Sequence, residues 1–293
     1  MLFDEATLRK LNQLALVASR IRAGAIKGER RSTRRGLSVE FADYRNYAPG
    51  DDLRRLDWNL YARLERPFIK LMEEEEDLAV HILIDASKSM DWGAGDTHKF
   101  SYALRLAAAT GAIALGSGDL LTTALLADGR VPAQYGPARG SPHLLPFFSF
   151  LEGQTPSGQT ALVSGLNAYQ YSHHRPGMIF LISDLLTAQD WMASLSPYLA
   201  QGNEIILLHL LAPEETDPPL TGDLRLIDCE SNLAQEVSLD SNLRQLYTQR
   251  LAGWRESIRQ NCAKKGVRYQ YLNTAHPWDK FILLDLRRAG IVK

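Results

Sequence analysis

Residues 78–90 read LAVHILIDASKSM, an apolar run that ends in an aspartate and is followed by two serines at alternate positions. The run has the length of a strand and no polar alternation, which is typical of a parallel strand covered on both faces. Its end carries three oxygen-bearing side chains, those of Asp85, Ser87 and Ser89. The stretch predicts a central strand of an α/β sheet with a polar loop at its carboxyl end.

The chain after this strand alternates between apolar strand patterns and helix patterns. Further strands are expected at residues 120–128, 129–136, 178–184, 203–211 and 267–273, and a hairpin at 224–239 that turns at Ser231 and Asn232. Helices are expected at residues 99–116, 141–151, 160–172, 188–200, 241–265 and 278–289. This order predicts a doubly wound, mostly parallel sheet with helices on both faces, a Rossmann-like architecture.

The first 77 residues have a different texture. Apolar residues between Leu8 and Ile26 recur at helical spacing, which predicts an amphipathic helix that docks on a larger body. An arginine-rich passage with Gly and Pro punctuation follows. We therefore expect a small irregular N-terminal module over residues 1–77 and an α/β domain over residues 78–293.

Composition narrows the function classes. The chain has 293 residues, 45% of them hydrophobic and 23% charged, with a net charge of −1, so no global attraction to nucleic acid or anionic membrane is expected. Residues 1–35 carry nine Lys and Arg against three Asp and Glu, but no aromatic residues lie between Arg20 and Arg35 to stack on bases. No apolar run approaches the ~20 residues of a spanning helix. With two isolated cysteines, Cys229 and Cys262, these features predict a cytoplasmic protein with reduced thiols, no nucleic-acid partner and no integral membrane segment.

Two more oxygen-bearing residues are expected to join the loop after the first strand. Thr160 lies in SGQTAL, and Asp184 ends the strand MIFLISD. Taken singly, each suits a helix cap. Because the carboxyl ends of parallel strands meet at one sheet edge, and because Mg²⁺ prefers oxygen ligands, the ordered set predicts a divalent-cation site. Its residues are Asp85, Ser87, Ser89, Thr160 and Asp184.

The order DASKSM, GQTAL and LISDLL resembles the metal-ion-dependent adhesion site of von Willebrand factor A domains, and all five oxygen positions match. The resemblance covers roughly residues 78–290. It implies a von Willebrand factor A-like fold in which the serines and Thr160 contact Mg²⁺, with Mn²⁺ or Ca²⁺ as alternatives. Asp85 and Asp184 would hold the ion directly or through water, and a partner's carboxylate would complete the coordination.

The passage GERRSTRRGLSVEFADYRNYAPGDDLRRLDWNLYAR, residues 28–63, is similar to the signature of the domain of unknown function 58 family. The matching residues are Gly28, Ser32, Gly36, Glu40, Phe41, Arg45, Tyr47, Pro49, Gly50, Asp51, Asp52, Arg55, Asp57, Trp58, Ala62 and Arg63. The resemblance implies a MoxR-type AAA+ ATPase as partner, in chaperone-like remodelling or maturation of a client protein. Charges of both signs lie at close spacing here, which favours internal ion pairs and turns over catalysis; the residues are Arg45, Asp51, Asp52, Arg55, Asp57 and Arg63.

Enzymatic alternatives lack their usual residues. A phosphatase of the haloacid dehalogenase type needs a second aspartate where Ser87 stands, and no phosphate-binding GxxxxGK[ST] or GxSxG motif occurs. The histidines show no ligand spacing, although His209 in a buried strand is expected in an unusual environment. The sequence therefore predicts a non-catalytic, metal-dependent protein-binding module. A metal-dependent hydrolase acting on phosphoesters or peptides at the same site stays the alternative.

Overall fold

The computed structural model describes residues 3, 5–18, 39–48, 50–74, 78–172, 175–219, 222–230 and 233–293. The chain divides into two compact units, residues 1–26 with 78–293 and residues 27–77. The N-terminal residues, expected in one module with the arginine-rich passage, thus group with the sheet. Leu11 and Leu16 explain this grouping, because both are buried in the core on one face of the sheet.

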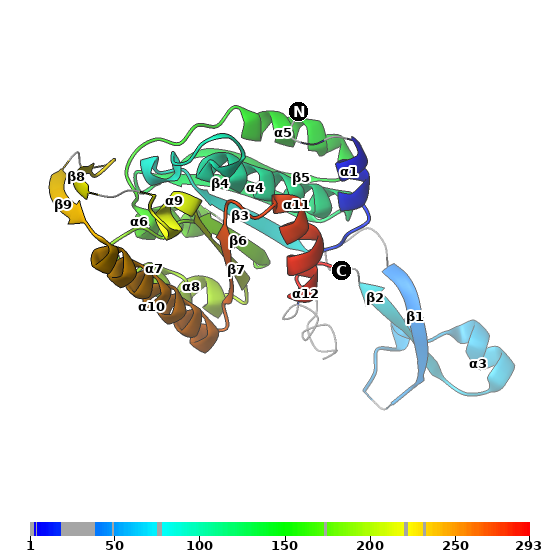
Figure 1. Ribbon diagram of the computed structural model, residues 1–293. Coiled ribbons are helices and arrows are strands. Elements are labelled where there is room, and N and C mark those ends of the chain that lie inside the picture. The colour runs from blue at the N-terminus through cyan, green and yellow to red at the C-terminus, as the bar shows by residue number, and fades with distance from the viewer. Residues whose placement is uncertain are drawn as a thin grey trace. The chain divides into compact units, whose positions relative to one another are not determined.

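The larger unit is built on a six-stranded sheet in the order β10-β7-β6-β3-β4-β5 (Figure 1). The strands are β3 (Ala79–Asp85), β4 (Leu120–Ala127), β5 (Arg130–Arg139), β6 (Met178–Ser183), β7 (Glu204–Leu211) and β10 (Arg268–Asn273). Every neighbouring pair is parallel except β4 and β5. The prediction of a mostly parallel α/β sheet is confirmed.

Helices cover both faces of this sheet. One face carries α1 (Glu5–Leu11), α4 (Lys99–Gly116), α5 (Leu144–Glu152), α11 (Trp278–Lys280), a π-helical turn (Phe281–Asp285) and α12 (Leu286–Arg288). The other carries α6 (Leu162–Ser172), α7 (Trp191–Ser194), α8 (Ser196–Ala200) and α10 (Ser241–Lys265). Along β3, Ile82 and Ile84 enter the first core and Leu83 the second, as the alternation of side chains along a strand requires. This double burial explains the uninterrupted apolar run.

The strand order reverses direction next to β3. The chain runs from β3 to β4 and β5 on one side, and then crosses back to β6, β7 and β10 on the other. Open α/β sheets bind ligands outside the carboxyl ends of the strands at such a switch point. Asp85 ends β3 and Asp184 directly follows β6, so the topology brings both to this point.

The two edges of the sheet differ. β5 is an antiparallel edge strand that contains Pro132 and Pro137. β10, at the opposite edge, has the sequence RYQYLN and pairs in parallel with β7. A separate hairpin follows β7 through the short helix α9 (Pro213–Thr216) and consists of β8 (Gly222–Ile227) and β9 (Ala234–Leu239). Ser231 and Asn232, expected at its turn, lie outside the described residues.

Several predicted elements have other bounds. The helix expected from Leu8 ends at Leu11, because Leu16 instead pairs with Val292 in an isolated bridge. The helix expected over 188–200 divides into α7 and α8 at Leu195, where Pro197 fits the first turn of a new helix. The C-terminal helix contains a π-helical turn, which no periodicity in the sequence had indicated.

The smaller unit contains an antiparallel pair, β1 (Val39–Asn46) and β2 (Phe68–Glu74), and the helix α3 (Trp58–Leu64). Asp57 caps α3 by accepting from the backbone N–H groups of Asn59 and Leu60. The Arg45 guanidinium binds both oxygens of Asp51, at 2.7 and 2.6 Å. The interpretation of these charges as ion pairs and turn chemistry is confirmed for the described residues. The signature residues Gly28, Ser32, Gly36 and Pro49 lie outside them.

Candidate metal centre

The loop after β3 brings three of the expected oxygens together. Ser87 donates to Asp85 Oδ1 through both its backbone N–H, at 3.0 Å, and its hydroxyl, at 2.7 Å. Its Oγ lies 3.0 Å from Ser89 Oγ. The second Asp85 oxygen accepts from the Ser183 hydroxyl at the end of β6, at 2.7 Å. Hydrogen bonds thus fix the Asp85 carboxylate from its own loop and from the end of the neighbouring strand β6.

The segment before α6 adds Thr160 to this group. It docks on the β3 loop through two backbone hydrogen bonds, from Ser157 N to Ala86 O at 2.7 Å and from Lys88 N to Gly158 O at 3.0 Å. Thr160 Oγ1 then lies 3.3 Å from Ser89 Oγ. The docking places the hydroxyl beside the serines, although the two segments are about seventy residues apart in the chain.

Consecutive oxygens in this row are spaced as adjacent ligands of a small cation are. Adjacent ligands in an octahedral Mg²⁺ site, with bonds of about 2.1 Å, lie roughly 3.0 Å apart. The successive distances from Asp85 Oδ1 through Ser87, Ser89 and Thr160 are 2.7, 3.0 and 3.3 Å. Each hydroxyl retains a lone pair when it donates its proton. The donor set fits Mg²⁺ or Mn²⁺ in chemistry and in spacing.

Asp184 is placed differently from the other four. Its Oδ2 accepts from the Lys99 ammonium at 2.7 Å and its Oδ1 accepts from the Leu186 N–H at 3.1 Å. Lys99 also donates to Glu215 Oε1 at 2.7 Å. Because the Lys99 ammonium already pairs with it, Asp184 suits contact with a cation through water better than direct ligation.

The charges of this cluster are almost fully withdrawn from solvent. The side chains of Lys99 and Asp184 are both 0% exposed. Burial alone would lower the pKa of Lys99, but the carboxylates of Asp184 and Glu215 outweigh it and raise that pKa. Burial, and then the charge of Asp184, raise the pKa of Asp85 to about 6. Lys99 pairs with Asp184 and Glu215, and Asp85 adds a third carboxyl group that feels the charge of Asp184, so a nearby cation would offset the excess negative charge.

Three members of this cluster were not foreseen from the sequence. Lys99 is the first residue of the helix expected over 99–116, and Glu215 lies in the short helix α9, which matches no motif. A third, Glu230, belongs to the segment between β8 and β9 and binds Thr160 through both of its oxygens. No spacing rule links any of them to Asp85. Such contacts depend on long-range packing.

His209, expected in an unusual environment, is fully buried in β7 beside Ser183 of β6. Its Nδ1 lies 2.8 Å from the Tyr269 hydroxyl, and its Nε2 has no hydrogen-bond partner among the described residues. Burial lowers its pKa to about 4. The imidazole is therefore neutral at physiological pH. His173 and His174 lie outside the described residues.

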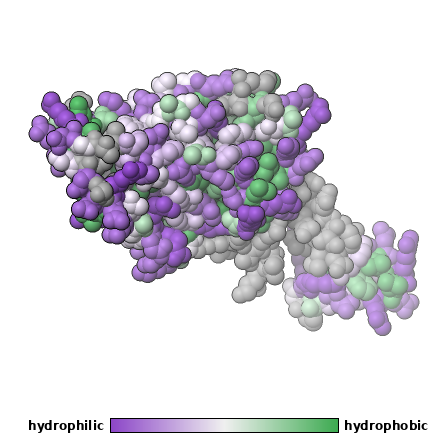
Figure 2. Space-filling model, viewed as in Figure 1, coloured by the Kyte–Doolittle hydropathy of each residue, from purple (hydrophilic) through white to green (hydrophobic). Residues whose placement is uncertain are grey.

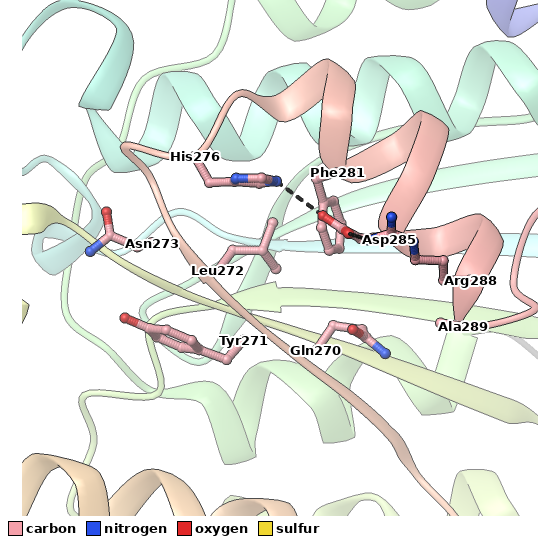
Figure 3. A pocket seen from close by; sticks show the side chains of 9 residues that line it. All are labelled: Gln270, Tyr271, Leu272, Asn273, His276, Phe281, Asp285, Arg288 and Ala289. Carbon is pink, nitrogen blue, oxygen red and sulfur yellow. Dashed lines mark hydrogen bonds and ion pairs between the residues drawn. The ribbon is translucent and has the colours of Figure 1, made fainter.

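A pocket of about 510 Å³ lies between β10 and the C-terminal helical segment (Figure 3). His276 points toward Asp285 across it, with Nε2 and Oδ2 3.0 Å apart. The nine lining residues, all within the described part of the chain, include no serine, threonine or cysteine that could act as a nucleophile beside this pair. None of the five predicted site residues lines this pocket.

Three further observations bear on the site. Polar residues dominate the visible surface of the larger unit, with hydrophobic side chains scattered between them (Figure 2). None of the described helices is both long and apolar enough to cross a membrane. Within the described residues, no three or more His, Cys, Asp and Glu side chains form a group that could hold a metal. The candidate centre therefore depends on its hydroxyl ligands.

Comparison with known proteins gives the family. The chain is 30% identical to the uncharacterized protein Rv1480 of Mycobacterium tuberculosis, over 98% of this chain and 92% of the relative, and equally to the uncharacterized protein Mb1516 of Mycobacterium bovis. A solved structure of an aerotolerance-related membrane protein from Bacteroides fragilis aligns with a TM-score of 0.45 and 17% identity, over 72% of this chain and 99% of that one. BatB from Bacteroides thetaiotaomicron aligns at 0.43 and 15%, over 73% and 98%. Likeness at this level carries no argument about function. The family described as "Protein of unknown function DUF58" matches residues 43–257, and the chain belongs to it.

Proposed function

We propose that this protein is a non-catalytic binding module of the von Willebrand factor A type, which captures a partner through a divalent cation. The supporting observation is the row of oxygens on Asp85, Ser87, Ser89 and Thr160, spaced at 2.7 to 3.3 Å. Hydroxyl ligands leave the cation only partly neutralised, so it attracts one further carboxylate. That ligand would come from an acidic residue of the partner.

The partner that we propose is a MoxR-type AAA+ ATPase, acting with this module on a client protein in the cytoplasm. The support is the DUF58 signature and the family membership it accompanies. Asp85 and the hydroxyl groups would hold the cation, and Asp184 would contact it through water. Lys99 and Glu215 would fix the position of Asp184.

The test measures the cation first and the partner second. Titration calorimetry with Mn²⁺ should show one site in the wild type and none in Asp85→Asn. Asp190→Asn is a matched control, because Asp190 is an exposed aspartate that makes no capping hydrogen bond. A purified MoxR-type ATPase should then be captured in Mg²⁺ and released by EDTA. Undiminished capture in EDTA would contradict the metal-dependent part of the proposal.

A hydrolase at the same site is the alternative. The histidine on the loop after β3, His98, has its Nε2 3.0 Å from Asp91 and its Nδ1 against the Ser101 N–H, so both ring nitrogens are engaged. This arrangement does not favour a general base at the centre. Turnover of a phosphoester or peptide panel in Mg²⁺ that disappears in Asp184→Ala would establish the hydrolase instead.

A further inference from the structure

The side chain of Glu230 reaches the candidate metal centre from outside the sheet. One carboxylate oxygen accepts from the Thr160 hydroxyl at 2.5 Å and the other from the Thr160 backbone N–H at 3.0 Å. Glu230 lies in the segment that joins β8 and β9, about seventy residues further along the chain. A carboxylate of this same chain is thus bound beside the hydroxyl that the proposed cation requires.

The hairpin holds Glu230 through its own turn. Asp228 Oδ1 accepts from the Glu230 N–H at 2.9 Å, and Asp228 N donates to Leu233 O at 2.8 Å. None of the described residues of the hairpin belongs to either hydrophobic core, and Ile227 and Leu233 are 62% and 73% exposed. Figure 1 shows the two strands at the outer end of the larger unit. The hairpin can therefore move without opening the core.

Glu230 extends the row of oxygens described above. Successive oxygens from Asp85 to Thr160 lie within hydrogen-bond distance of each other, and Glu230 Oε1 continues the row at 2.5 Å from Thr160 Oγ1. A threonine hydroxyl has two lone pairs and one proton, so it can donate to Glu230 and still bind a cation. The Glu230 carboxylate thus lies beside Thr160, where the acidic residue of the proposed partner would bind the cation.

We propose that Glu230 is an intramolecular ligand of the cation, which fills the coordination position of a partner's carboxylate until the β8–β9 hairpin withdraws. The inference rests on the proposed function, because it takes the cation site as given. It adds that a carboxylate of the chain itself competes with the partner's carboxylate for the cation. A partner then binds only by displacing Glu230.

The experiment measures Mn²⁺ affinity and the hydrogen exchange of residues 222–239 in the full chain. Glu230→Gln should weaken Mn²⁺ binding by at least about tenfold, since loss of even a group that only supports a ligand costs a metal site that much. Mn²⁺ should slow exchange in the wild-type hairpin and leave it unchanged in the variant. Glu236→Gln is the matched control, since Glu236 is exposed on β9 of the same hairpin; it should behave as the wild type.

A simple carboxylate tests the competition. Sodium acetate should restore fast exchange to the Mn²⁺-bound hairpin, whereas sodium chloride at the same ionic strength should not. Glu230→Asp keeps the charge but shortens the reach, and should give an intermediate Mn²⁺ affinity. This variant separates loss of the ligand from a general change in the hairpin.

Three outcomes are distinguishable. Weaker Mn²⁺ binding in Glu230→Gln, with Glu236→Gln unaffected, supports the inference. Mn²⁺ binding that is equal in wild type and Glu230→Gln, with cation-independent exchange of the hairpin, overturns it and leaves the proposed function standing. Absence of Mn²⁺ binding in the wild type overturns both.

Discussion

Lys99 Nζ lies 2.7 Å from Asp184 Oδ2, and neither side chain has any exposure to solvent. Removing one partner of such a pair leaves a buried charge without compensation, which costs about 3–5 kcal/mol. We expect Lys99→Met to lower the free energy of unfolding by that order, measured by urea denaturation in EDTA. Adding Glu215→Gln should recover part of the loss, because one of the stranded carboxylates becomes neutral. Arg259→Met, at the exposed pair with Glu256, is the control and should change little.

The hydroxyl groups that we propose as ligands should each contribute to cation affinity. Ser87→Ala, Ser89→Ala and Thr160→Val are expected to weaken Mn²⁺ binding by about tenfold or more, measured by calorimetry, with the fold retained. Ser149→Ala, at an exposed position on α5, should leave the affinity unchanged. If all three variants bind as the wild type does, the oxygens are only a hydrogen-bonded network.

The cation should also stabilise the fold. Ligand that binds only the native state adds about 2.7 kcal/mol at a free concentration of one hundred times its Kd. Thermal unfolding should therefore shift upward in saturating Mg²⁺ or Mn²⁺, and Asp85→Asn should abolish the shift. A shift that persists in this variant would place the bound ion elsewhere.

Burial of His209 makes stability depend on pH. Its pKa is about 4 in the fold and about 6.5 when unfolded, so its contribution is present above pH 6.5 and is lost as the pH falls toward 4. This loss amounts to about 2 kcal/mol between pH 7 and pH 5. The raised pKa of Asp85, about 6, acts in the opposite sense, because protonation then favours the fold as the pH falls.

The two contributions can be separated by comparing His209→Gln with the wild type. The stability difference between them should shrink by about 2 kcal/mol from pH 7 to pH 5, measured by urea denaturation at each pH. Asp85 titrates in both proteins and largely cancels. A difference that stays constant with pH would mean that the His209 pKa is not lowered by folding.

Gly158 holds the Thr160 segment in a conformation that favours glycine. Its φ is +81°, and a Cβ at this position would meet the carboxylate of Asp128. Gly158→Ala should cost about 1–3 kcal/mol of stability and weaken Mn²⁺ binding, because Thr160 lies two residues further on. Gly253→Ala is the control, as Gly253 lies within α10 with open space around it and alanine favours helix. It should equal or exceed the wild type in stability.

The two cysteines give a chemical probe of the hairpin. Burial raises the pKa of Cys262 to about 12, whereas Cys229 is exposed next to Glu230. Partial burial and then the charges of Glu230 and Asp228 raise the pKa of Cys229. Glu230→Gln should lower it, so alkylation of Cys229 by iodoacetamide at pH 8 should be faster, as followed by mass spectrometry. Equal rates in wild type and variant would show that the charge of Glu230 does not reach the thiol.

The sequence predicted what depends on local pattern. Uninterrupted apolar runs identified the strands, as at Ile82 to Ile84, and the polar residues after them identified the candidate centre at the carboxyl edge. The local pattern is sufficient here because the central strands β3, β6 and β7 are buried on both faces and each loop follows its strand directly.

What escaped prediction depends on distant partners. Leu14, Leu16 and Val17 continued a helical pattern, but Leu16 pairs with Val292 at the other end of the chain. Lys99 begins a helix, a position that is normally solvated, and is buried because Asp184 and Glu215 contact it from two distant segments of the chain. Pro197, by contrast, was a visible reason to divide the helix expected over 188–200.

The edges of the sheet bear on how copies of this protein could associate. An exposed strand edge can template the addition of a strand from another molecule, and prolines obstruct this because they have no N–H to donate. β5 carries Pro132 and Pro137, whereas β10 carries none. Growth of the six-stranded sheet from one molecule into the next is therefore disfavoured at β5, and strand addition to this sheet would proceed through β10 and stop after a single pairing of two such edges.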